Sequence, residues 1–132
     1  MSTPCYCTGL RMATRKVAGL YDAALEPTGI NIAQFAVLRN IERRQPVSLT
    51  ELGRALMLDR STMGRNIRVV EKLGLVTTER GEDQRESVVR LSEHGTVVLQ
   101  EAEPLWQQCQ SEVAKRIGPE RLQALGEINQ LL

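Results

Sequence analysis

Residues 59–74 read DRSTMGRNIRVVEKLG, and the organisation of the chain can be worked out from them. Asp59 can accept free backbone N–H groups at the start of a helix, and Gly74 can end that helix in the left-handed conformation. Three apolar side chains recur at helical spacing on one side: Met63, Ile67 and Val70. The other side is basic and polar, so the pattern predicts a two-sided helix over about 59–73.

The segments on either side of this helix extend it into a larger motif. Before it, a Ser-x-x-Glu capping-box pattern at 48–51 opens a short helix, and residues 57–58 leave only a tight turn. After it, β-branched stretches at 75–80 and 88–91 flank a polar tip and predict a two-stranded hairpin. A short helix, a turn, a second helix and a hairpin are typical of a winged helix-turn-helix.

Helical patterns also occupy both ends of the chain. An apolar stripe runs through 9–25 and stops at 26–29, where Pro27 and Gly29 break it, and Asn31 with Gln34 forms a capping-box pair for the next helix. Near the other end, one long and one short helix are expected, with their start and break signals at Ser92, Pro104 and Pro119. These outer helices carry more apolar surface than a small lobe can cover, so we expect a second copy of the chain to cover it.

We therefore expect one mainly α-helical domain over residues 1–132, with a two-stranded β-hairpin as its wing. Residues 30–92 form the winged helix-turn-helix lobe. Residues 1–29 and 93–132 form N- and C-terminal dimerisation helices.

The composition excludes several classes of protein. With 42% apolar and 25% charged residues the chain is in the globular range, and no apolar run approaches the roughly 20 residues that span a bilayer. It lacks the apolar stretch of a secretory signal, so we expect a cytoplasmic protein that contacts no membrane. Its one Trp, two Tyr and one Phe are too few to stack the bases of a single strand.

The net charge of +1 hides a division of charge along the sequence. Residues 39–90 hold 11 basic and 8 acidic side chains, whereas residues 91–132 hold 3 basic and 6 acidic ones. A basic lobe joined to an acidic tail predicts that the lobe binds an anionic polymer. The affinity should depend on contacts from individual basic side chains rather than on total charge, and it should fall as the salt concentration rises.

The helix at about 59–73 carries the side chains that a DNA major groove requires. Its candidate DNA-binding residues are Arg60, Ser61, Thr62, Arg65, Asn66 and Arg68. Arginine can donate two hydrogen bonds to guanine, and hydroxyl groups reach bases or phosphates. An ordinary solvated helix face has a similar composition, but the adjacent turn and hairpin favour DNA.

The predicted wing, about 79–90, adds two candidates. Arg85 at its tip can enter a narrow minor groove, where the negative potential is enhanced. Asp83 can hold the loop or the guanidinium in place. The alternative for both residues is a charged, exposed turn without a ligand.

Several motifs occur in the order found in the MarR (multiple antibiotic resistance regulator) family. RSTMGR at 60–65 and EKLGLV at 71–76 resemble the start of its recognition helix and the junction to its first wing strand. DQR at 83–85 matches its Asp-x-Arg wing signature, and LSEHG at 91–95 is similar to its strand-to-helix junction. The resemblance covers nearly the whole chain.

The resemblance implies a homodimeric transcription regulator, most often a repressor. In this family two recognition helices enter successive major grooves of a pseudo-palindromic double-stranded operator. Many members release DNA when a small aromatic or phenolic effector binds, and others when a cysteine near the N-terminus is oxidised. Glu86 stands where the family often has a polar or basic residue, and the end of the sequence at Leu132 leads us to expect a smaller interface from the last helix.

Cys5 and Cys7 precede the first predicted helix and are the candidates for a redox role. A thiolate stabilised by a basic group such as Arg11, or by a helix N-terminus, reacts with oxidants, whereas small apolar cysteines also pack at dimer interfaces. Together with His94 and Cys109 they offer four metal ligands, but their spacing is unlike that of a zinc site. We expect no metal and no other cofactor.

Two other functions compete with DNA binding. A winged helix can serve as a protein-interaction or dimerisation module, in which case Arg65, Arg68 and Arg85 are dispensable. A thiol enzyme using Cys5 or Cys7 needs a matched base and an oxyanion site, which the sequence does not supply. We therefore expect no catalytic residues and no enzymatic activity.

Overall fold

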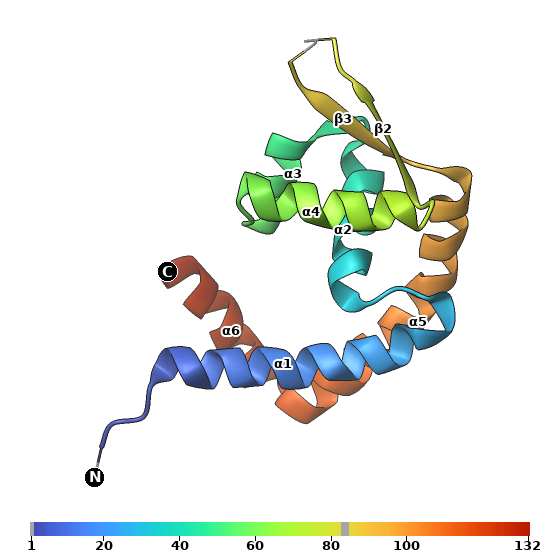
Figure 1. Cartoon of the computed structure of the whole chain (residues 1–132). Helices are drawn as coiled ribbons and strands as arrows, with labels where there is room; N and C mark the ends of the chain where they lie inside the picture. The colour runs from blue at the N-terminus through green and yellow to red at the C-terminus, as the bar shows by residue number, and fades with distance from the viewer. Residues whose placement is uncertain (1, 83–84) are drawn as a thin grey trace.

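Helices make up most of the fold, which is seen here in a computed structural model that describes residues 2–82 and 85–132. The elements follow in the order α1 (Tyr6–Leu25), η1 (Glu26–Thr28), α2 (Ile32–Arg44), β1 (Val47–Ser48), α3 (Leu49–Leu56), α4 (Arg60–Lys72), β2 (Val76–Arg80), β3 (Ser87–Leu91), α5 (Glu93–Ile117) and α6 (Pro119–Leu131). Figure 1 shows a lobe made of α2, α3, α4 and the sheet, which α5 connects to α1 and α6. In the described part of the chain, no helix is long and apolar enough to cross a membrane.

The helix starts confirm the caps that the sequence predicts. Asn31 Oδ1 accepts the Gln34 N–H at 2.9 Å and Gln34 Oε1 accepts the Asn31 N–H at 3.0 Å, so a complete capping box opens α2. The side chains that cap α3, α4 and α5 are Ser48, Asp59 and Ser92. Each satisfies a backbone donor that the helix itself leaves without a partner. α1 begins at Tyr6, three residues before the predicted start.

The sheet has three strands, in the order β1-β3-β2, so a short strand that the sequence did not predict joins the predicted two-stranded hairpin. β1 consists only of Val47 and Ser48, which pair antiparallel with Val89 and Val88. A strand of two residues, both of them buried, has no alternation that a sequence pattern can reveal. The hairpin itself is present, because β2 and β3 pair from Val76 opposite Leu91 to Arg80 opposite Ser87.

The hydrophobic core lies inside the lobe and extends to α5. Phe35 and Leu38 of α2, Leu52 of α3, Met63 of α4 and Leu99 of α5 are all almost completely buried. Because α2, α3, α4 and α5 each contribute at least one of these side chains, the core fixes α4 against α2 and α3. The opposite face of α4 is left toward solvent.

The junction of α4, the wing and α5 is built by close backbone contacts. A Cβ atom on Gly95 would lie 1.9 Å from the Leu75 carbonyl oxygen, so only glycine allows this approach. The Leu75 oxygen also accepts the Ser92 N–H at 3.0 Å. Ser92 Oγ donates to the Gly74 carbonyl at 2.6 Å and accepts the Gly95 N–H at 2.9 Å. The end of α4 and the start of α5 are thereby joined through one serine.

Contacts with α2 also attach the outer helices to the lobe. Asp22 of α1 accepts the Ile32 N–H, the first of α2, at 2.8 Å. Trp106 of α5 is half-buried, and its ring stacks on Phe35 with 5.6 Å between centroids, while the Arg39 guanidinium lies 4.3 Å above the Trp106 ring. α5 contains Pro104, and Figure 1 shows the helix changing direction along its length, as expected for proline inside a helix.

The Gly95 contact predicts a large effect from a single methyl group. Gly95→Ala would force α5 away from the Leu75 carbonyl and is expected to cost about 3 kcal/mol of unfolding free energy. In Gly19→Ala the added methyl group meets nothing within 4 Å, so this control should be neutral or gain up to about 1 kcal/mol from helix propensity. Urea unfolding of the three proteins measures both effects, and equal midpoints for Gly95→Ala and wild type would contradict the prediction.

Candidate nucleic-acid interface

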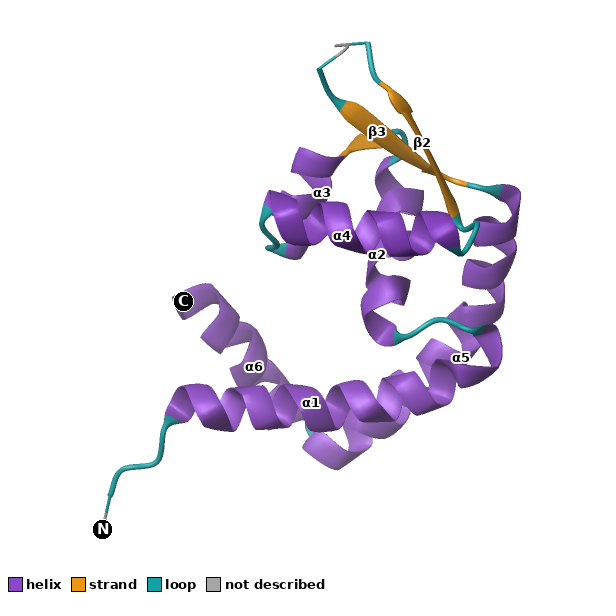
Figure 2. Ribbon diagram, viewed as in Figure 1, coloured by secondary structure: helices purple, strands orange, loops and turns teal. Residues whose placement is uncertain are grey.

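Helix α4 lies across the lobe with one face on the core and the other outward (Figure 2). Met63, Ile67 and Val70 form the buried face, as the sequence predicts. The exposed side chains of predicted DNA-binding residues on this helix are Arg60, Ser61, Arg65 and Arg68. No acidic residue occurs between Arg60 and Val70, so this face presents positive charge and hydroxyl groups.

The N-terminal end of α4 is organised by a chain of hydrogen bonds. The Asp59 carboxylate accepts the Thr62 N–H at 2.8 Å and the Thr62 hydroxyl at 3.0 Å. Arg65 Nη2 in turn donates to Thr62 Oγ1 at 3.2 Å. The Thr62 N–H, then its hydroxyl, and more weakly the Arg65 charge hold the pKa of Asp59 below its ordinary 3.8. Thr62 thus positions Arg65 while remaining half-buried itself.

Two more predicted residues lie further along the helix. Arg68 Nε donates to the Gly64 carbonyl at 3.3 Å, which holds the stem of the side chain along α4. Asn66 is half-buried and lines a cleft of about 140 Å³ between α4 and the start of α2, together with Asn31 and Gln34. Asn66 therefore lies at the edge of the exposed face, whereas Arg68 belongs to it.

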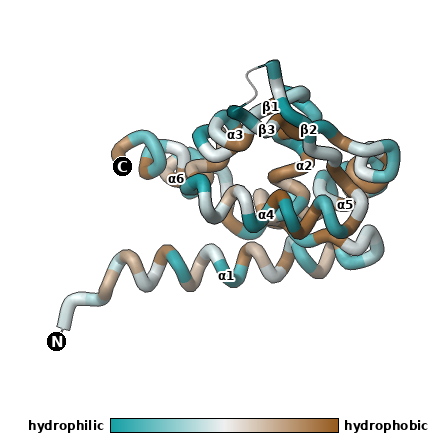
Figure 3. Tube along the Cα trace, turned by 45° about the horizontal axis from the view of Figure 1, so that its top comes forward, coloured by the Kyte–Doolittle hydropathy of each residue, from teal (hydrophilic) through white to brown (hydrophobic). Residues whose placement is uncertain are grey.

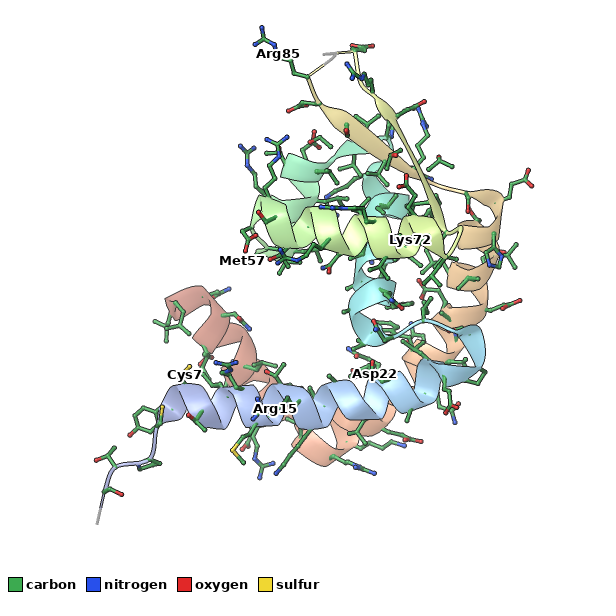
Figure 4. The ribbon with its side chains drawn as sticks, in the orientation of Figure 1. Cys7, Arg15, Asp22, Met57, Lys72 and Arg85 are labelled. Carbon is green, nitrogen blue, oxygen red and sulfur yellow. The ribbon has the colours of Figure 1, made fainter. Side chains whose placement is uncertain are left out.

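The wing projects beyond the lobe, and its strands are tied to each other and to α4. Glu79 on β2 and Arg90 on β3 form an ion pair at 3.1 Å, and Thr78 donates to Glu71 of α4 at 2.6 Å. Arg85 is exposed near the end of the hairpin that lies farthest from α1, as Figure 4 shows. The predicted role of Asp83 falls outside the described residues.

Met57 lies in the turn between α3 and α4, and from the sequence it was expected only to form part of that tight turn. Its side chain is 91% exposed, and its φ of 55° places it in the left-handed region, which costs a non-glycine residue about 1 kcal/mol. A methionine at a tight turn, where glycine or asparagine is expected, is the signal that could have identified it.

The outer helices enclose an apolar groove. Figure 3 shows hydrophobic and hydrophilic residues alternating along α1. The groove has a volume of about 800 Å³, and its apolar lining from α1, α5 and α6 includes Leu10, Val17, Ile117, Leu122, Leu125 and Ile128. Leu10 and Leu125 are each nearly half exposed, so the predicted dimerisation helices leave an uncovered apolar surface on the single chain.

The cysteines have different surroundings. Cys5 occupies the N-cap position of α1 without a side-chain cap bond, Cys7 lies in the first turn, and both are exposed. Hydrogen bonds from the Thr8 side chain and then its backbone hold the pKa of Cys5 below its ordinary 9.0. Cys109 lies buried in α5, and burial raises its pKa. Within residues 2–82 and 85–132, no three His, Cys, Asp or Glu side chains come together as a metal site would require.

Comparison with solved structures identifies the class of fold. The structure is similar to the Mycobacterium tuberculosis transcriptional regulator MosR solved in complex with DNA, with a TM-score of 0.87 and 32% identity over 97% of this chain and 96% of that one. It also resembles a mutant of MarR from E. coli solved with operator DNA, at a TM-score of 0.82 and 24% identity over 92% and 88% of the two chains, a likeness of fold alone. The chain is a winged helix-turn-helix protein.

Sequence comparison gives the family. The model of the MarR family matches residues 28–86, and the chain belongs to the MarR family of transcriptional regulators. A curated relative, the organic hydroperoxide resistance transcriptional regulator of Bacillus subtilis, is 26% identical over 97 residues, which make up 73% of this chain and 66% of the relative. The match thus spans slightly less than two thirds of that protein.

The lowered pKa of Asp59 predicts a pH-dependent term in stability. Because the folded pKa lies below the unfolded value, the stabilisation is fully present above about pH 3.8 and is lost as the pH falls through the folded pKa. Asp59→Asn keeps a good N-cap and does not titrate. From about pH 5 to about pH 2, the wild type should therefore lose more of its urea midpoint than Asp59→Asn does. Parallel curves for the two proteins would refute the assigned hydrogen bonds.

Proposed function

We propose that this chain is a homodimeric regulator of transcription that binds a specific sequence of double-stranded DNA and represses the genes it controls. The observation that carries the proposal is the exposed face of α4, which bears arginines and hydroxyl groups without an acidic side chain. Further support comes from MosR, a relative 32% identical to this chain that was solved in complex with DNA.

In the proposed complex α4 lies in the major groove. Arg65 and Arg68 donate to guanine edges or to phosphates, and Ser61 reaches the neighbouring bases or backbone. Thr62 holds Arg65 through its hydroxyl, which reduces the freedom that Arg65 loses on binding. Arg60 contacts a phosphate at the start of the helix in this proposal. Asn66 contacts the DNA from the flank of the helix.

The wing binds beside the recognition helix in this proposal. Arg85 enters the adjacent minor groove, where a guanidinium is attracted by the negative potential of a narrow A·T tract. We assign Asp83 the role of orienting Arg85. The Glu79–Arg90 ion pair between the wing strands supports the hairpin from which Arg85 projects.

A second copy of the chain is the proposed occupant of the apolar groove between α1, α5 and α6. The groove is long and apolar, and its rim residues Leu125 and Ile128 remain exposed in the single chain. A two-fold dimer would bury them and present two α4 helices to a pseudo-palindromic operator. We also propose that the protein acts in the cytoplasm and catalyses no reaction, as is usual for regulators of transcription.

The test begins with selection of bound duplexes from a random pool. A homodimer should select inverted repeats whose half-site centres are about 34–36 Å apart, one turn of B-DNA. Failure to enrich any duplex would overturn the proposal and favour a winged helix used only for protein interaction. Enrichment of single, unrepeated half-sites would overturn the dimer.

Arginine variants on the selected duplex then test the assignment of α4. Arg65→Ala and Arg68→Ala should each weaken binding by about 1–3 kcal/mol, with relaxed sequence preference if they contact bases. If they contact phosphates, the slope of log affinity against log salt should fall by about two, roughly one for each protomer of the dimer. Lys115→Ala, an exposed cation on α5, is the control and should bind as the wild type does. Unchanged affinity in both arginine variants would show that α4 is not the recognition helix.

The signal that releases DNA is proposed to be an oxidant acting on Cys5 and Cys7. The observation that favours this is the exposed Cys5 thiol with a lowered pKa, two residues from a second exposed thiol. A lower pKa increases the thiolate fraction, which is the reactive form. The curated relative named for organic hydroperoxide resistance supports the same kind of signal.

The proposed chemistry consumes one hydroperoxide. The Cys5 thiolate attacks the terminal oxygen of the hydroperoxide, the O–O bond breaks, and the alcohol leaves with a proton, so that Cys5 becomes a sulfenic acid. The Cys7 thiolate then attacks that sulfur and expels hydroxide, which leaves as water, to give a disulfide. Side chains two apart on a helix do not face each other, so this bond requires the first turn of α1 to rearrange.

Operator affinity before and after treatment with an alkyl hydroperoxide tests the redox proposal. The wild type should lose affinity and regain it with dithiothreitol, whereas Cys5→Ser and Cys7→Ser should keep it. Cys109→Ser, which removes the buried thiol, should respond as the wild type does. Peroxide-insensitive binding would exclude the oxidant. A loss of affinity with hydroxylated benzoic acids instead would assign the signal to a small aromatic or phenolic effector, the alternative that we retain.

A further inference from the structure

The turn between α3 and α4 holds Met57 in an unfavourable position. Its φ of 55° is left-handed, and its side chain is 91% exposed to solvent. The turn is fixed by its backbone, because the Leu58 N–H donates to the Gly53 carbonyl at 2.9 Å and the Met57 N–H to the Arg54 carbonyl at 3.4 Å. The conformation is therefore required at residue 57, whatever its side chain.

Folding gives no reason for a methionine there. The neighbouring Leu56 and Leu58 are half-buried and pack against the core, so they provide the apolar contacts of the turn. Glycine would adopt the same φ without steric cost. A large apolar side chain that is both strained and exposed is better explained by contact with a ligand than by stability.

The place of Met57 in the lobe indicates which ligand. It lies two residues before Asp59, the N-cap of α4, and Figure 4 shows it at one end of this helix with Lys72 at the other. In the proposed complex the N-terminal end of a recognition helix is the part closest to the base edges. Methionine is uncharged and flexible, and the apolar feature that the major groove offers is the C5-methyl group of thymine.

We propose that Met57 contacts the C5-methyl group of a thymine in each half-site and so contributes to sequence preference. The inference rests on the proposed function, since it requires DNA in the groove at α4. It adds an apolar contact to the polar and charged contacts already assigned to Arg65 and Arg68.

The experiment replaces the thymines of the selected duplex one at a time by deoxyuridine, which lacks only the methyl group. At one position in each half-site, wild-type affinity should fall about fivefold, the effect of losing one buried methyl contact. Met57→Gly removes the contact in both half-sites, so it should bind the thymine duplex about 25-fold less tightly than the wild type, about fivefold for each protomer, and should lose nothing further on the uracil duplex.

Controls separate this contact from a general defect. Met57→Gly should unfold at the same or a higher temperature, because glycine relieves the left-handed strain, and should sediment as the wild type does. Met57→Asn, also tolerant of left-handed φ, should show the same loss of DNA affinity. Val97→Ala, which trims an equally apolar but distant exposed side chain on α5, should bind normally. The salt slope should stay unchanged in both Met57 variants, since no charge is removed.

The outcomes distinguish failure of the proposed Met57 contact from failure of the proposed DNA-binding function. If the wild type binds a selected duplex and Met57→Gly binds it equally well, the inference is wrong and the proposed function stands. If the Met57 variants lose affinity by the same factor on the thymine and every uracil duplex, the side chain contacts the sugar or backbone, and the thymine assignment is wrong. Selection of no duplex by the wild type would overturn both.

Discussion

The approach of α5 to the Leu75 carbonyl at Gly95 determines how the parts of this protein are joined. Because no side chain separates the two backbones, α5 starts directly against the residue that links α4 to β2. Ser92 adds bonds to both sides of the same junction. The recognition helix, the wing and the long helix therefore meet at one point, and a shift of α5 carries α4 and the wing with it.

This junction separates two surfaces with different chemistry. On one side the lobe presents arginines and hydroxyl groups on α4, and the side chains of α4 that face inward are entirely apolar. On the other side α1, α5 and α6 present an apolar groove, and the segment that forms α5 and α6 is acidic on balance. The net charge of the chain is close to zero because the excess of basic side chains in residues 39–90 is offset by the excess of acidic ones in residues 91–132.

The sequence predicted the elements whose signals are local. Helix starts at Asn31, Ser48, Asp59 and Ser92 follow from short polar side chains placed before apolar periodicity, and the structure has all of them. β1 was missed because it depends on pairing with β3, more than forty residues later in the chain. The start of α1 at Tyr6 was placed too late because Cys5 makes no side-chain cap there.

In the candidate site, too, some features follow from a local sequence pattern and others depend on the folded structure. The buried and exposed faces of α4 could be predicted from helical period alone, whereas the chain of bonds from Asp59 through Thr62 to Arg65 depends on rotamers. The exposure of Met57 depends on how α3 and α4 turn, which no periodic pattern describes. The orientation of Asn66 toward α2 likewise follows from packing between two helices rather than from either one.

The hydrogen bond from the Ile32 N–H to Asp22 links a helix of the proposed dimer surface to the first turn of the lobe. In the proposed dimer α1 belongs to the interface and α2 to the lobe that carries α4, so a change in the angle between α1 and α2 would move the two α4 helices relative to each other. B-DNA presents the same face of its major groove only once per turn, about every 34–36 Å. A small rotation of α1 would therefore decide whether both α4 helices can enter successive major grooves together. The hydrogen bond from the Ile32 N–H to Asp22, which fixes α1 against α2, thus helps to match the protein to the length of one DNA turn.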